Sequence, residues 1–249
     1  MEHRIVKKQK CMVIAAMLTG VLVSGCSSVP EETTQVVSGS MVELTQQEMI
    51  TRSSLVAIGS VSEISDAFQI KPVNGGDPSV FTDYTVEVSD ILRGELDSDT
   101  VSVRIQGGTA NGMTTIAEEA PELEKGQTYL LYLYQPGRGG SYNTEGDYYY
   151  ITGVSQGVFA LSSDTPLSAG KDNAETRLVD ISTDAETEWT LRDAEESIQD
   201  INEKQPADKD YVYKQAYENW QANLDSGFMT QEEFDRSVKE SKIYAKIIK

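Results

Sequence analysis

Two serine-containing motifs in the sequence have the spacing of catalytic nucleophiles. Residues Gly153–Gly157 fit G-x-S-x-G, and Ser168–Lys171 fit S-x-x-K. A G-x-S-x-G elbow needs a helix directly after the serine, whereas Val158–Leu161 has the composition of a strand. The S-x-x-K serine belongs at the start of a helix, but Gly170 predicts a loop, and the sequence contains no K-T-G element. We therefore interpret both motifs as turns.

The distribution of histidine and cysteine limits the chemistry further. The single histidine is His3, and the two cysteines are Cys11 and Cys26. Removal of residues 1–25 would leave no histidine and only Cys26, which excludes Ser-His-Asp and Cys-His catalysis and any zinc site built on those ligands. We predict a non-catalytic protein without cofactor or metal. The alternative is a histidine-free hydrolase of cell-wall polymer that uses carboxylates, whose geometry a sequence does not reveal.

The first 26 residues have the layout of an export signal. Four basic residues precede the apolar run Cys11–Val23, which as a helix would rise about 20 Å, short of the roughly 30 Å hydrocarbon core. The run ends in Val23–Cys26, which resembles the lipobox of bacterial lipoproteins. The resemblance implies a signal peptide over 1–25, cleavage between Gly25 and Cys26, and diacylation of Cys26. An ordinary secretory cleavage near Ser24 is the alternative.

This layout predicts a location and a class of partner. Two acyl chains hold a protein stably on a bilayer, so we expect a lipid-anchored protein on the extracytoplasmic face of the cell membrane. Cleavage would leave 17 basic and 39 acidic residues, a formal net charge of −22. Such a chain repels nucleic acid. The expected partners are therefore the membrane, through the lipid on Cys26, and another component of the cell envelope.

After the signal peptide, residues 26–44 lack apolar periodicity and predict a flexible stalk. A domain over 45–165 follows, and it opens with a short helix whose Thr45 and Glu48 have capping-box spacing. We expect one helical turn near 117–123. Otherwise the domain has the composition of strands, which we place at 55–61, 81–92, 101–105, 128–134, 148–152 and 157–161.

The predicted fold class is mainly β with α additions: a small antiparallel barrel followed by a helical C-terminal region. The order of LVAIGSVSEI, YTVEVSDILRGEL, VSVRIQGG, LEKGQTYLLYLY and GVSQGVFAL resembles the OB-fold of the netrin and metalloproteinase-inhibitor-like class. That resemblance implies an OB-like barrel. The animal inhibitors place a disulfide-linked N-terminal cysteine on the protease metal. Inhibition by that route is not expected here, because Cys26 would carry lipid.

The last part of the chain is predicted to be helical. Residues 166–210 are strongly acidic and indicate a linker with one solvated helix after Thr190, which Pro206 ends. Two apolar stripes at helical spacing over 211–249 predict a helical hairpin, with Gly227 ending its first helix. The phrase LDSGFMTQEEFDRSVK resembles the short C-terminal modules called SHOCT, which implies self-association through this hairpin.

Tyrosine is enriched around the Gly-rich loop 136–146. Tyr142 lies within this loop, and Tyr148, Tyr149 and Tyr150 follow it. Tyrosine rings are typical of recognition surfaces, because they combine apolar area with a polar tip. We predict that these four residues contribute to a binding surface for another envelope protein or a glycan.

Overall fold

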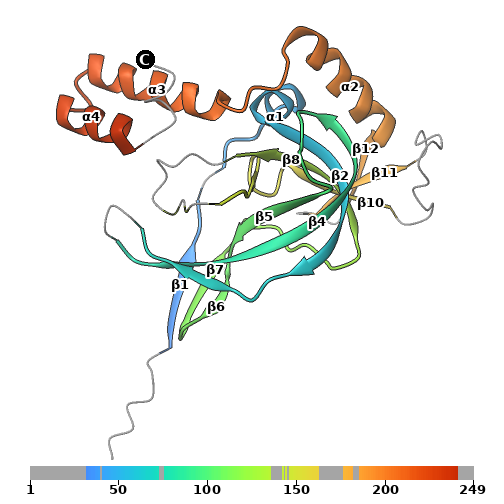
Figure 1. Cartoon of the computed structure of the whole chain (residues 1–249), viewed down its shortest axis with the longest axis horizontal. Coiled ribbons are helices and arrows are strands. Elements are labelled where there is room, and N and C mark those ends of the chain that lie inside the picture. The colour runs from blue at the N-terminus through green and yellow to red at the C-terminus, as the bar shows by residue number, and fades with distance from the viewer. Residues whose placement is uncertain are drawn as a thin grey trace, which may run out of the picture. The chain divides into compact units, whose positions relative to one another are not determined.

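The computed structural model describes residues 32–39, 41–72, 76–135, 142, 144, 146–162, 176–181 and 185–240. These residues form a mainly β chain with a helical region over 191–240 (Figure 1). The predicted signal peptide, Gly25 and Cys26 lie outside the described residues, as do the S-x-x-K motif at Ser168–Lys171 and residues 241–249 of the hairpin.

The described strands belong to two sheets. The larger sheet has nine strands in the order β12-β11-β10-β8-β2-β4-β3, with β5 paired to β4 and β9 paired to β8, all antiparallel. The smaller sheet has the order β1-β7-β6, and its β1–β7 pair is parallel. The strands are β1 (Thr33–Val37), β2 (Leu55–Ile64), β3 (Phe68–Ile70), β4 (Ser79–Arg93), β5 (Thr100–Gln106), β6 (Gly108–Ala110), β7 (Met113–Ala117), β8 (Thr128–Tyr134), β9 (Tyr150–Ile151), β10 (Val158–Leu161), β11 (Arg177–Asp180) and β12 (Ala185–Thr190).

Strands β2 and β8 lie at the centre of the large sheet because both of their faces are apolar. Leu131 and Leu133 of β8 belong to one buried cluster with Val86, Val103 and other residues. Leu130 and Tyr132, which alternate with them, belong to a second cluster. Since successive side chains of a strand point to opposite faces, this pattern requires cover on both sides. The predicted central strand at 128–134 is confirmed.

Helices α1 (Gln46–Arg52) and α2 (Leu191–Lys204) cover one face of the large sheet (Figure 1). Ile50 of α1 and Leu191 and Ile198 of α2 are buried against that face. Both helices begin with a capping box, Thr45 with Glu48 in α1 and Thr190 with Asp193 in α2. The box satisfies backbone donors that would otherwise be unpaired at a helix start. The first of these two boxes was predicted from the sequence.

Helices α3 (Tyr211–Asp225) and α4 (Gln231–Glu240) form the predicted hairpin. Gly227 has φ +77°, a left-handed conformation that suits glycine after a helix end. Thr230 and Glu233 hydrogen-bond each other at the start of α4. The Tyr217 and Phe234 rings meet edge to face, with a centroid separation of 5.7 Å. Because a five-residue connection joins them, the two helices run antiparallel.

Arg93 joins α1, β4 and the end of α2. Its side chain is 2% exposed. The guanidinium donates to the carbonyl oxygens of Ser53 at 3.1 Å and Gln205 at 2.9 Å, and to the Asn202 side chain. A cation is favoured at a helix C-terminus, where backbone carbonyls lack helical partners. Burial lowers the pKa of Arg93.

Part of the segment expected to be a flexible stalk is ordered secondary structure. Residues 33–37 form β1, which pairs with β7 over five residues from Thr33–Met113 to Val37–Ala117. Farther on, Leu44 N–H donates to Gln156 Oε1 at 2.8 Å. The prediction failed because β1 finds its backbone partners in a strand about 80 residues away, and local composition carries no sign of that pairing.

Three other expectations differ from the structure. The helical turn expected near 117–123 is absent from those residues, where β7 ends in a turn. Within the expected acidic linker, 177–180 and 185–190 form β11 and β12, which extend the sheet beyond β10. Helix α2 is also not simply a solvated helix, because one side of it is buried. The exposed acidic side chains dominate the composition of this region and conceal its apolar positions.

Among the described residues, the paired strands of the large sheet do not close into a barrel. One isolated parallel bridge joins Val103 of β5 to Tyr149, next to β9. In it, Arg104 N–H donates to Tyr149 O and Tyr149 N–H donates to Ser102 O, both at 2.8 Å.

Candidate functional site

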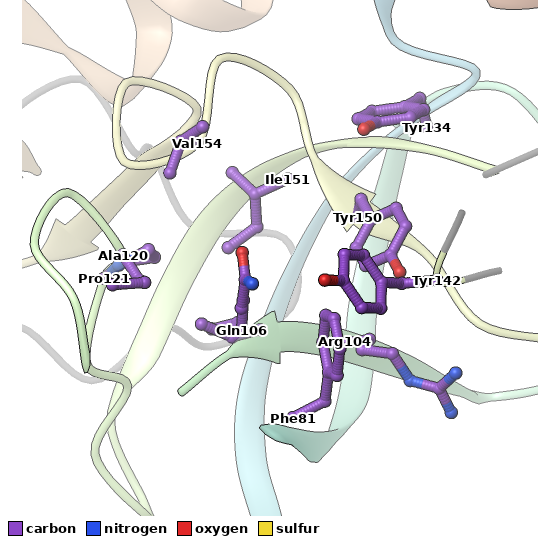
Figure 2. A pocket seen from close by; sticks show the side chains of 12 residues that line it. Phe81, Arg104, Gln106, Ala120, Pro121, Tyr134, Tyr142, Tyr150, Ile151 and Val154 are labelled. Atoms are coloured by element: carbon purple, nitrogen blue, oxygen red, sulfur yellow. The ribbon is translucent and has the colours of Figure 1, made fainter. Parts of the chain in front are cut away.

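An aromatic pocket of about 330 Å³ opens beside β5, β8 and β9 (Figure 2). Its walls come from separate parts of the chain, and most of them are apolar or aromatic. We call this hollow the aromatic pocket. Its lining residues are Phe81, Arg104, Ile105, Gln106, Ala117, Ala120, Pro121, Tyr134, Tyr142, Tyr150, Ile151 and Val154.

The aromatic rings pack on one another around the pocket. Tyr142 lies 5.6 Å from Phe81, and Tyr150 lies 5.9 Å from Tyr134 and 5.6 Å from Tyr148, measured between ring centroids. Tyr142 Oη donates to Asp77 O at 2.8 Å, which holds that ring against Phe81. Tilted and edge-on contacts of this kind restrict the rings. The pocket therefore has a largely preformed aromatic wall.

Arg104 is the cation of the pocket, and its charge is already compensated. Its Nε and Nη2 donate to the two carboxylate oxygens of Asp83, each at 2.7 Å, and Nη1 donates to Thr144 Oγ1 at 2.8 Å. The guanidinium carbon also lies 3.8 Å from the ring centroid of Tyr148. Burial would lower the pKa of Arg104, but the bidentate pair with Asp83 raises it. In Figure 2 the guanidinium points away from the space between the rings.

The Tyr134 and Tyr150 phenols of the pocket are neutral over the physiological range. Burial raises the pKa of Tyr134 to about 12, and the nearby Tyr148 adds to this effect. Burial also raises the pKa of Tyr150, again with a contribution from Tyr148. With Arg104 paired to Asp83, the pocket presents rings, hydroxyl groups and the Gln106 amide. Such a site suits a neutral ligand with an apolar face.

The structure separates the four tyrosines that were predicted to share a surface. Tyr142 and Tyr150 line the aromatic pocket, and Tyr148 lies behind them, stacked on Arg104. Tyr149 points elsewhere and is buried in the core with Val103 and Leu133. Strand alternation explains this difference, because neighbours in an extended chain point to opposite sides.

Sequence reasoning missed Phe81, Arg104, Gln106 and Tyr134 as pocket residues. Arg104 and Gln106 lie in β5, on either side of Ile105. Arg104 occupies a polar position of the alternating strand β5, so the pattern placed it opposite the apolar face but gave no sign of a pocket. Its contact with Asp83 is set by the pairing of β4 with β5, which joins these residues as direct neighbours. Nothing local indicates that Tyr134, the last residue of β8, would line a pocket.

The G-x-S-x-G motif forms a turn, as predicted. Residues 152–157 connect β9 to β10, and a strand rather than a helix follows Ser155. Within this turn Val154 has φ +59°, a conformation that is unusual for a β-branched side chain. Val154 is 42% exposed and lies at the rim of the aromatic pocket. Strained backbone of this kind is often found at binding sites.

The described residues offer little to other kinds of site. No group of three or more histidine, cysteine, aspartate or glutamate side chains is placed to hold a metal ion within the ranges given above. Among the described helices, α1 to α4, none has both the length and the apolar character that crossing a bilayer requires.

No protein-family model matches the chain, and no curated protein matches it.

Proposed function

We propose that this chain is a membrane-anchored, extracytoplasmic lipoprotein that acts as a non-catalytic binding module of the cell envelope. The observation that carries the proposal is the aromatic pocket, with four rings around about 330 Å³ and its guanidinium paired to Asp83. Aromatic walls with a few neutral polar groups suit the binding of a sugar ring or an apolar side chain. The ligand would be carried by a glycan or by another envelope protein.

We also propose that the β domain is an OB-like barrel. Strands β5, β4, β2, β8 and β9 each pair with the next in that order. The bridge between Val103 and Tyr149, which directly precedes β9, joins the two ends of this series. The pocket then lies where the series is joined, a position at which small barrels often bind ligands. The resemblance to the netrin-like OB class supports the same arrangement.

The anchor is tested at Cys26. We expect Cys26→Ala to release the protein from the membrane fraction, because no acyl chain can then be attached. Cys11→Ala changes the other cysteine, within the apolar run, and should leave the protein with the membrane. Fractionation followed by immunoblotting measures both. Equal membrane retention of the Cys26→Ala and Cys11→Ala variants would contradict lipid anchoring at Cys26.

Ligand binding is tested by photo-crosslinking in living cells. A photoreactive phenylalanine analogue at Val154 should give a discrete adduct, whereas the same analogue at Ile91, an exposed apolar residue of β4, should not. Ala120→Trp fills the aromatic pocket and should abolish the adduct. Ala110→Trp, on β6 and outside the lining, should preserve it. Mass spectrometry of the adduct distinguishes protein from glycan, and an adduct unaffected by Ala120→Trp would overturn the proposal.

A further inference from the structure

A second hollow lies on the other side of the segment 117–121 and differs from the aromatic pocket in charge. It has a volume of about 1040 Å³ and is lined by parts of 41–49, 116–122, 155–159 and 180–189. Five carboxylates line it: Glu43, Glu118, Glu119, Glu122 and Asp180. No lysine or arginine is among the described residues that line it. We call this hollow the acidic groove.

The acidic groove also exposes apolar side chains to solvent. Met41 and Ile116 are 39% and 48% exposed, and Trp189 is partly exposed. Val36, 57% exposed, lies opposite Ile116 in the β1–β7 pair. Large apolar side chains grouped beside carboxylates favour an occupant that carries both apolar and cationic side chains.

Residues 241–249 have this chemistry. Their sequence, SKIYAKIIK, contains three lysines, no acidic residue and four large apolar side chains. The described part of the chain is strongly acidic by contrast. Residues 241–249 therefore have the charge that complements the acidic groove, in contrast to the acidic remainder of the chain.

The hairpin places the end of α4 on the side of the β domain that holds the groove. Phe234 of α4 packs on Tyr217 of α3, and the antiparallel course returns the end of α4 toward Tyr211. Tyr211 in turn lines a hollow with Met41 and Leu44, both of which also line the acidic groove. Nine extended residues reach about 30 Å. Residues that follow Glu240 are thus close enough to bind there.

We propose that residues 241–249 bind in the acidic groove of their own chain. The three lysines pair with the groove carboxylates, and the isoleucines and Tyr244 cover the apolar side chains around Met41, Ile116 and Trp189. The segment would fasten the helical hairpin to the β domain. This inference does not depend on the aromatic pocket or on the ligand proposed for it.

Fluorescence of Trp189 tests the proposal. The protein contains two tryptophans, so Trp220→Phe makes Trp189 the single reporter. In a chain that stops after Glu240, titration with the synthetic peptide SKIYAKIIK should change the emission saturably. The full chain should respond at least tenfold more weakly at the same peptide concentration, because its groove is already occupied. Raising the salt concentration should weaken peptide binding, since exposed charges are screened.

Matched variants show whether the groove carboxylates are responsible. Combined Glu118→Gln, Glu119→Gln and Glu122→Gln should weaken peptide binding at least tenfold. Three carboxylates on exposed faces of α2 and α3, changed together as Glu196→Gln, Glu203→Gln and Glu218→Gln, should leave it unchanged. No response of Trp189, or equal binding by both triple variants, would overturn the proposal.

A measurement on the full chain covers the case in which the shortened chain does not fold. Changing Lys242, Lys246 and Lys249 to glutamate should raise acrylamide quenching of Trp189 by uncovering the groove. The same change at Lys71, Lys204 and Lys239, which lie outside the groove lining, should not. Light scattering completes the test: a dimer that forms with the full chain and is lost on truncation would assign the segment to a second copy and overturn binding within one chain.

Discussion

Arg93→Ala is expected to lower the free energy of unfolding by about 3 kcal/mol, among the largest effects of any single substitution in this chain. The Arg93 side chain is almost fully buried and donates to the carbonyl oxygens of Ser53 and Gln205 and to the Asn202 side chain. Alanine would leave these acceptors without their donor and would open a cavity between β4 and the end of α2. Urea unfolding followed by circular dichroism measures the change.

Arg52→Ala is the matched control for this prediction. Arg52 lies on α1 and forms an exposed pair with Glu48 four residues earlier. Exposed pairs of this type contribute about 0.5 kcal/mol or less. A loss at Arg93 no larger than the loss at Arg52 would contradict the role assigned to the buried guanidinium.

Asp83→Ala is expected to destabilise the fold by about 3 kcal/mol and to disrupt the aromatic pocket. It leaves the Arg104 guanidinium, 8% exposed, without the carboxylate that binds it through two bonds of 2.7 Å. Removing one partner of a buried pair costs more than removing both, because an uncompensated charge remains. The double variant Asp83→Leu with Arg104→Met should therefore recover most of the lost stability.

Thermal and urea unfolding of the unchanged chain, of Asp83→Leu, of Arg104→Met and of the double variant form a double-mutant cycle. The expected coupling is about 2 kcal/mol or more. If the stability losses of the two single variants simply add up in the double variant, Asp83 and Arg104 do not stabilise each other, and the prediction is wrong. The double variant should also fail to give the Val154 crosslink despite its recovered stability, because Arg104 forms part of the pocket wall.

The parts of the fold that were predicted correctly are those whose signal is local. Strand β8 was identified because apolar residues occupy both of its faces, and the start of α1 because Thr45 and Glu48 have capping-box spacing. Strands β1, β11 and β12 were missed for a shared reason: each is stabilised by a partner that the local pattern does not reveal. Pairing β1 with β7 joins residues about 80 positions apart, so composition alone described this segment as a stalk.

The candidate site was predicted in part for a similar reason. The enrichment in tyrosine indicated the correct region of the chain, and Tyr142 and Tyr150 do line the pocket. The expectation that Tyr149 shares their surface ignored strand alternation, which directs it into the core. The pairing of Arg104 with Asp83 depends on the register of β4 with β5, and register is set by the whole sheet rather than by either strand.

Strand β1 has a consequence for how far the binding module can reach. If Cys26 carries lipid as proposed, seven peptide steps separate it from Thr33, the first residue of β1, and they span at most about 25 Å. A free stalk that ended at Leu44 would have allowed a span of about 65 Å between Cys26 and the folded domain. The paired strand therefore reduces the maximum distance between Cys26 and the folded domain by more than half. The first residue of the β domain would therefore lie within about 25 Å of the lipid, and components near the membrane surface are the ligands that the domain would meet first.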